Sequence, residues 1–397
     1  MNRREAWNRP VIRVLKTASC LALIAIATNA VAAENSRSRQ SPMGSFGGEI
    51  AAPLDSPGFF GSALLTYAHV YSVKDDAGND ITSATTPLGK SPIPSSVPLQ
   101  TATPSKGAIP NGTYTLNGMG PVNFLHNQSV VTFLGGYLTE STYADGHVSF
   151  SFQTSYSKMD RTMDIPITFG VTPTPPPAQA PVVNAVAAAT QAQITAQLAA
   201  KLATQNMSLE GFGDTELSVV WIRHQDRMKV AAGVSLFVPT GSYDANRGPN
   251  PGYGKFYSVR PGVAVTYSLN PNHTSQDWDR GVTVAGRVGY MINGTNTDTD
   301  YRTGNLVNAE LAIVKVLEGG RWAFGANLYR VQQVTDDSGT GLGTNPALRY
   351  RVSGIGPFVS FKIPGKDAGF NLSFSQNLDG HNAQFANFWQ LRFVKDF

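Results

Sequence analysis

The sequence contains six histidines, and their spacing shows whether a catalytic metal site is plausible. No two of them lie four residues apart, so neither the H-x-x-x-H nor the H-E-x-x-H arrangement of zinc sites occurs. The G-x-S-x-G nucleophile motif is absent as well. We therefore expect no metal, no cofactor and no catalytic residues, and we predict that the protein is not an enzyme. The histidines are His69, His126, His147, His224, His273 and His381.

Two acidic arrangements are the remaining candidates for chemistry. Asp226 follows His224 by two residues, but it falls near a predicted short turn, where both side chains would be solvated. Asp336 and Asp337 are adjacent acids, as in some barrel proteases, although their place at the start of a loop favours a polar rim or a hydrated cation. A membrane-bound hydrolase acting on lipid or peptide is thus the least favoured alternative.

The elements that must position any site are predicted from the alternation of apolar and polar residues after residue 211. Leu217, Val219 and Trp221 alternate with Glu216 and Ser218, and comparable runs recur to the end of the chain. Period-two alternation, repeated without helices between, is typical of antiparallel strands in a barrel. Adding strands near residues 62–72, 128–139 and 147–156 gives about twelve, an even number as bacterial barrels have.

A soluble β-sandwich would also alternate, so two further features distinguish the fold. The residues opposite the apolar set are Gly, Ser, Thr, Asn and single charges, as expected for a water-filled interior. Short connections such as 318–321 and 365–367 alternate with long polar loops at 242–258, 336–346 and 379–384. We therefore predict an all-β fold, an antiparallel transmembrane β-barrel of the outer-membrane type, with a helical loop insert.

The strand alternation also predicts which polar side chains face the interior. A charge is expected inside because Arg or Lys facing lipid at mid-bilayer costs roughly 2–4 kcal/mol. Four of these residues could form a constriction in which the tyrosine contacts aromatic solutes; alternatively, charge pairing only stiffens the wall. Those four are Arg287, Glu310, Asn327 and Tyr329, and the other candidates are Glu216, Lys229, Asn371, Gln390 and Arg392.

The N-terminus has the three parts of a secretory signal peptide, predicted for residues 1–32. Five basic residues precede an apolar run, and Ala30-Val31-Ala32 resembles a cleavage site. The whole chain has 31 Lys+Arg and 27 Asp+Glu, so removing five bases and one acid leaves 26 of each. The mature charge is balanced and predicts no nucleic-acid partner. The only cysteine, Cys20, would be removed with the signal.

The rest of the chain is predicted to hold a periplasmic segment at 33–56 and the transmembrane barrel at 57–397. A Pro/Ala-rich insert at 171–208 contains a run of helix formers, with Val186, Ile194 and Leu198 near one face. This helix would either plug the interior or lie on the rim. The chain ends in an alternating segment with Phe397 last, which resembles the terminal strand that the barrel-assembly machinery recognises.

Six short motifs, named at the end of this paragraph, closely resemble motifs of the family labelled "putative MetA-pathway of phenol degradation". The family resemblance implies an outer-membrane channel of a Gram-negative bacterium, in contact with outer-membrane lipid and passing small hydrophobic or aromatic solutes passively. A general diffusion porin for small polar solutes is the alternative. The motifs are G-F-G-D at 211–214, F-V-P-T-G-S-Y at 237–243, Y-R-T-G at 301–304, Q-V-T-D-D at 333–337, P-G-F-F-G at 57–61 and Y-L-T-E at 137–140.

Overall fold

The computed structural model describes most of the chain after the N-terminal region. The described residues are 56–81, 83–85, 91–92, 114–246, 248–269, 281–317, 321–343 and 348–397. The predicted signal peptide and the predicted segment at 33–56, except residue 56, lie outside them. The chain divides into two compact units, one built mainly from residues 124–162 and 205–397 with the first strand, the other from 81–123 and 163–204.

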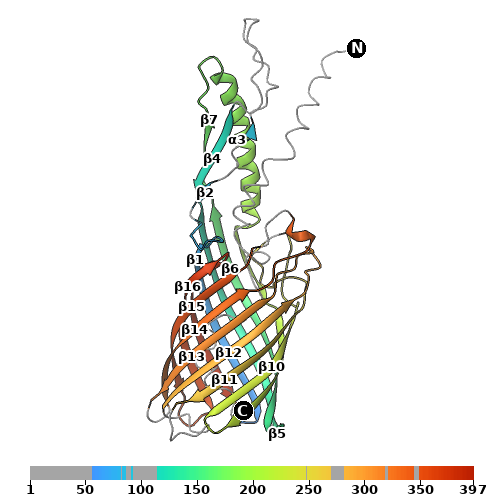
Figure 1. Ribbon diagram of the computed structural model, residues 1–397, viewed down its shortest axis with the longest axis vertical. Helices are drawn as coiled ribbons and strands as arrows, with labels where there is room; N and C mark the ends of the chain where they lie inside the picture. The colour runs from blue at the N-terminus through green and yellow to red at the C-terminus, as the bar shows by residue number, and fades with distance from the viewer. Residues whose placement is uncertain are drawn as a thin grey trace. The chain divides into compact units, whose positions relative to one another are not determined.

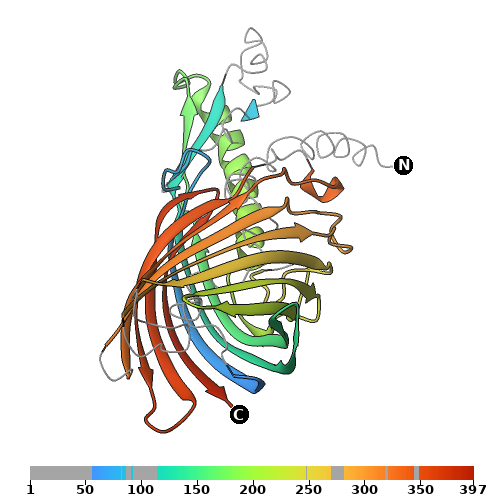
Figure 2. The same cartoon turned by 60° about the horizontal axis from the view of Figure 1, so that its bottom comes forward.

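The first unit is a barrel, which confirms the predicted fold class. One antiparallel sheet contains 13 strands, and a pairing of β5 with β6 closes twelve of them into a ring, with β8 attached to β6. Figure 2 shows these strands curving round to meet. Its strands are β1 (Gly58–Val73), β5 (Asn123–Tyr143), β6 (Gly146–Asp164), β8 (Met207–Phe212), β9 (Thr215–Gln225), β10 (Met228–Val238), β11 (Ser258–Ser268), β12 (Gly281–Asn293), β13 (Leu306–Val316), β14 (Trp322–Gln333), β15 (Arg351–Lys362), β16 (Ala368–His381) and β17 (Gln384–Asp396).

Closure joins the first and last strands of the chain. β1 pairs with β17 from Phe60 opposite Asp396 to Val73 opposite Gln384, and the other side of β1 pairs with β5. Each strand of the ring therefore has a hydrogen-bonded neighbour on both sides. A closed ring satisfies the backbone amides internally, which a sheet inside a lipid bilayer requires.

Alternation along the strands separates an apolar outer face from an inner face, as predicted. On β13, Leu311 is 61% exposed, whereas its neighbour Ala312 is 5% exposed. Exposed aromatic side chains gather near both ends of the strands, for example Trp322 at one end and Tyr257 and Tyr290 at the other. An outward apolar band between aromatic girdles is typical of outer-membrane barrels.

The connections differ between the two ends of the barrel. At one end, two-residue turns join β5 to β6 at Ala144 and Asp145 and β9 to β10 at Asp226 and Arg227; three of these four residues have positive φ. At the other, the loop-bearing end, residues 239–257, 294–305 and 334–350 form longer connections, the last containing the short helix η3 (Thr340–Leu342). The predicted long loop at 379–384 is wrong, because β16 and β17 extend until only Asn382 and Ala383 remain between them.

The second unit is a small sheet with a helix, labelled in Figure 1. Its strands are β2 (Ser83–Thr85), β3 (Ser91–Pro92), β4 (Thr115–Pro121) and β7 (Thr168–Thr172), with β4 between β2 and β3 and also paired to β7. The helix α3 (Ala180–Ala203) falls inside the predicted insert. Strands β2, β3 and β4 were not predicted, because the stretch before residue 121 is rich in Pro, Ser and Thr and has little alternation; β7 was not predicted either.

Helix α3 forms because Ala, Gln and Leu are good helix formers and a proline occupies its first turn. Val183, Ala187, Ile194 and Leu198 are its buried residues, and the first three share a cluster with Tyr114 and Leu116. The opposite face is mostly alanine and glutamine and is exposed. Among the described residues, no helix is both long enough and apolar enough to cross a membrane.

Candidate functional site

The inner face of the barrel carries the predicted polar residues, and an ion pair joins two of them. Arg287 of β12 and Glu310 of β13 stand opposite each other in the strand register. Arg287 Nη2 donates to Glu310 Oε1 at 2.8 Å, and both side chains are mostly covered. Charged pairs of this kind hold neighbouring strands in register, because separating the two side chains would leave each charge covered and without its partner.

A second ion pair lies on the same side of the barrel. Arg260 Nη2 of β11 contacts Glu216 Oε1 of β9 at 2.5 Å, across the intervening strand β10. The Arg260 guanidinium carbon also lies 5.0 Å from the centre of the Phe237 ring. The sequence interpretation missed Arg260 because it began this strand at Val263. Extending the alternation back past Pro261 would have placed it on the inner face.

Tyr329 lies beside the first ion pair, and its side chain lies along the inner wall of the barrel over the next strand. In the register, Glu310 stands opposite Tyr329, and Tyr329 stands opposite Gly354. A Cβ atom at Gly354 would overlap the Tyr329 ring and hydroxyl, so the ring occupies the space that glycine leaves. The hydroxyl donates to Asn377 Oδ1 at 2.7 Å. Both polar ends of this contact are thereby satisfied.

The remaining candidates are inward-facing but are not gathered into one site. Asn371 donates to Ser360 Oγ at 2.8 Å, and Ser373 donates to Gln390 Oε1 at 3.3 Å. Asn327, only 1% exposed, lies two residues from Tyr329 on β14, and Arg392 of β17 stands opposite Asn371, while Lys229 is buried on β10. The structure thus places Arg287, Glu310, Asn327 and Tyr329 on three neighbouring strands and the other candidates elsewhere on the wall.

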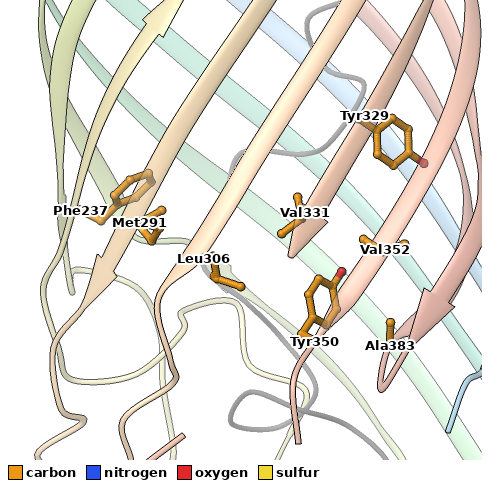
Figure 3. Packing of buried hydrophobic residues seen from close by; sticks show 8 residues of the cluster. All are labelled: Phe237, Met291, Leu306, Tyr329, Val331, Tyr350, Val352 and Ala383. Atoms are coloured by element: carbon orange, nitrogen blue, oxygen red, sulfur yellow. The ribbon is translucent and has the colours of Figure 1, made fainter. Parts of the chain in front are cut away.

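An apolar cluster covers the inner face at the loop-bearing end. Phe237, Met291, Leu306, Val331 and Val352 come from five different strands, at or near the strand ends that lead into the long loops. Figure 3 shows these side chains together with Tyr329, Tyr350 and Ala383. We call these eight residues the inner apolar cluster. It was not predicted, because their apolar side chains fall on the polar face of the alternation.

We call the inward-facing ion-pair residues Glu216, Arg260, Arg287 and Glu310 the polar row. Tyr329 belongs to the inner apolar cluster and also stands opposite Glu310 of the polar row. Arg260 similarly places its guanidinium against Phe237 of the cluster. The inner wall therefore changes from apolar side chains near the loops to paired charges further along the strands.

A buried acid, Asp337, organises the loops at the loop-bearing end. Asp337 accepts hydrogen bonds from the Tyr301 hydroxyl at 2.5 Å and from Gly304 N and Gln333 Nε2 at 2.7 Å each. Asp336 instead contacts Arg349 Nε at 2.7 Å on the surface. The adjacent acids therefore have separate partners and do not form the shared carboxylate pair of a protease.

The other loop contact joins two motifs that are close in space but not in sequence. Asp214 Oδ1 accepts from Gly241 N at 3.0 Å, and its Oδ2 accepts from Tyr253 N at 3.3 Å. Ser242 N donates to Phe212 O at 2.8 Å. The motifs at 211–214 and 237–243 are thus one loop anchor, and those at 301–304 and 333–337 are another.

No group of three or more His, Cys, Asp and Glu side chains within the described ranges could hold a metal ion. His224 lies on β9, and Asp226 occupies the tight turn after it with φ of 48°. That pair thus belongs to a hairpin end.

Comparison with known families identifies the chain. A family model described as "Putative MetA-pathway of phenol degradation" matches residues 182–393, which is more than half of the sequence. The chain belongs to this family. Together with the closed barrel and its apolar outer face, this membership places the protein in the outer membrane of a Gram-negative bacterium.

One solved structure shows the same type of fold. An outer membrane channel from Pseudomonas putida F1 superposes with a TM-score of 0.59 at 11% identity, covering 90% of this chain and 100% of that one. The β domain of the Bordetella autotransporter BrkA has a TM-score of 0.42 at 9% identity, covering 86% of this chain and 100% of that one. No curated protein matches the sequence.

Proposed function

We propose that this family member is a channel for the passive uptake of small apolar or aromatic compounds across the outer membrane. The observation that carries the proposal is the inner apolar cluster at the loop-bearing end. Apolar and aromatic side chains bind apolar solutes by removing their surface from water, at roughly 25 cal/mol per Å². Such a surface favours entry of a hydrocarbon or phenol without requiring ATP or a bound cofactor.

The alternative of a general diffusion porin is less well supported. The charges of the two ion pairs on the inner face are matched, Arg287 with Glu310 and Arg260 with Glu216. Their charges neutralise each other within the wall. We infer that the polar row narrows the passage and that the inner apolar cluster selects what enters it.

The test compares two isosteric substitutions on the inner face. Val331→Thr adds a hydroxyl to the inner apolar cluster, and Val314→Thr makes the same change in the separate cluster formed with Ala285, Ala312 and Phe358. A strain lacking the gene is complemented with each form, and uptake of radiolabelled toluene and phenol is measured. We expect Val331→Thr to slow uptake severalfold and Val314→Thr to change it much less.

Liposome swelling with sugars tests the alternative in parallel. Rapid swelling with the wild-type protein, combined with toluene uptake that does not depend on the gene, would replace our proposal by the general porin. Growth of the deletion strain on aromatic carbon sources gives a further readout of the same proposal.

Phe397, whose ring is exposed beyond β17, is proposed to guide delivery to the assembly machinery.

A further inference from the structure

The outer face of the barrel carries a groove among its described residues. This groove of about 620 Å³ crosses β1, β5, β6, β9 and β10, which are neighbours in the sheet. Its volume lies within the roughly 300–1,000 Å³ of ligand pockets. The residues that shape it are Phe59, Gly135, Phe150, Phe152, Val219 and Leu236.

The groove exists because Gly135 leaves a gap in a wall of large side chains. A Cβ at this position would lie 3.0 Å from Cε1 of Phe152, so the phenylalanine ring from the next strand leans over the glycine. At the other side, the rings of Phe59 and Tyr137 pack with their centroids 4.9 Å apart. Aromatic rings therefore border the groove on both sides.

Every large side chain lining the groove points away from the barrel interior. Phe59, Phe150 and Phe152 are 67%, 51% and 52% exposed, and they occupy the outward positions of their strands. The lining contains no charged residue, and the hydroxyl of Ser218 is already bonded to Ser235 Oγ at 2.8 Å. The groove offers carbon surface and no group that would recognise a charged headgroup.

The identity of the occupant follows from where the groove lies. It is continuous with the apolar outer face, which in an outer-membrane barrel is the interface with lipid. Its lining comes from five strands, so an acyl chain lying in it would contact side chains of several strands at once. We propose that the groove binds one acyl chain of a membrane phospholipid, as a site separate from the channel interior.

The experiment uses Gly135→Leu, which fills the groove, and Gly286→Leu as the matched control. Gly286 also faces outward, on β12, and a Cβ there would lie 3.2 Å from Cδ2 of Leu311, so both substitutions meet one flexible side chain. The proteins are released from phospholipid nanodiscs and their retained lipid is counted by native mass spectrometry. We expect wild type and Gly286→Leu to keep one phospholipid and Gly135→Leu to keep at least threefold less.

A second measurement keeps the proposal testable if Gly135→Leu fails to fold. Wild-type protein is irradiated with a phospholipid carrying a photoreactive acyl chain, and we expect labelled peptides from residues 150–152 and 217–219. Equal retention of phospholipid by all three proteins, or labels spread evenly round the barrel, would overturn the proposal. Dimer masses without retained lipid would show instead that a second copy of the chain covers the groove.

Discussion

The hydroxyl of Tyr329 donates a hydrogen bond to Asn377 Oδ1 at 2.7 Å, passing over Gly354 on the strand between them. The contact ties three strands together and keeps the tyrosine ring against the wall. It also leaves the polar end of the ring occupied by protein. Tyr329 is only 3% exposed, so its ring is part of the packed wall.

Gly354→Ala is expected to displace Tyr329, because the added methyl would occupy the place of the ring. Overpacking of this kind costs about 1–3 kcal/mol. We predict a lower unfolding temperature. It is measured by heating samples to a series of temperatures and finding where the faster-migrating folded band is lost on the gel. Gly170→Ala is the control, since a Cβ there would meet nothing within 4 Å; an equal loss in both variants would contradict the packing role.

Removing one partner of the Arg287–Glu310 pair should be worse than removing both. Arg287→Met leaves a carboxylate in a covered position, at a cost of about 3–5 kcal/mol, whereas replacing both partners by apolar residues is often close to neutral. We expect urea unfolding to show the larger loss for Arg287→Met and a partial recovery in Arg287→Met/Glu310→Leu. Additive losses would show that the two side chains do not depend on each other.

The same Arg287→Met variant tests whether the polar row forms a constriction. A residue at the narrowest point controls both the size and the charge preference of the ion current. We therefore predict that single-channel recordings will show altered conductance and altered ion selectivity. Unchanged values for both would leave the pair with a purely structural role.

Asp337→Asn should loosen the loops without opening the barrel. The amide would place an NH2 group among three donors, those of Tyr301, Gly304 and Gln333, and charge-assisted bonds of about 1.5–3 kcal/mol each would be weakened. We expect faster proteolysis within residues 294–305 and 334–350, detected by mass spectrometry. Asp336→Asn is the matched control, because its partner Arg349 is exposed and the pair contributes little.

Acid pH should release the contact between Asp300 and Thr340. Hydrogen bonds from the Thr340 side chain and then from its backbone N–H hold the pKa of Asp300 below its ordinary value. A lowered folded-state pKa means that the contact stabilises the loop above the unfolded pKa of about 3.9 and is lost as pH falls through the folded value. In Thr340→Val the pKa of Asp300 should rise toward that ordinary value.

The measurement is a carbon NMR titration of the Asp300 carboxyl in detergent-solubilised protein. Thr299→Val serves as the control, because the Thr299 hydroxyl has no hydrogen-bond partner among the residues that the structure describes. The same titration curve in Thr340→Val and in wild type would remove the threonine hydroxyl as the cause.

The sequence predicted the barrel well because strand alternation is a local property. Leu311 and Ala312 already differ in kind, and their opposite facing follows from the period of two. Loop lengths were harder to predict: the polar residues 379–384 looked like a loop, yet cross-strand pairing extends β16 and β17 through most of them. Pairing with a neighbour outweighed composition there.

The candidate site was predicted only in part, because neighbours in a sheet cannot be derived from one strand. The facing of Arg287 and Glu310 could be predicted separately, but their ion pair depends on the register between β12 and β13. The inner apolar cluster was missed because Phe237 and Leu306 are apolar residues on the polar face of the alternation, and their shared contacts form only when five strand ends meet. Whether α3 plugs the interior or lies on the rim stays a prediction.

Pairing of β1 with β17 makes the two ends of the polypeptide a single seam. Until β17, which is 13 residues long, is in place, both β1 and β16 keep an unpaired edge that could pair with another chain. Stepwise addition of strands along the sequence cannot complete the wall, since its final hydrogen bonds connect residues more than 300 positions apart. A chain that ends before β17 would present an unpaired strand edge to other protein chains in the periplasm, and we expect such a chain to be degraded there.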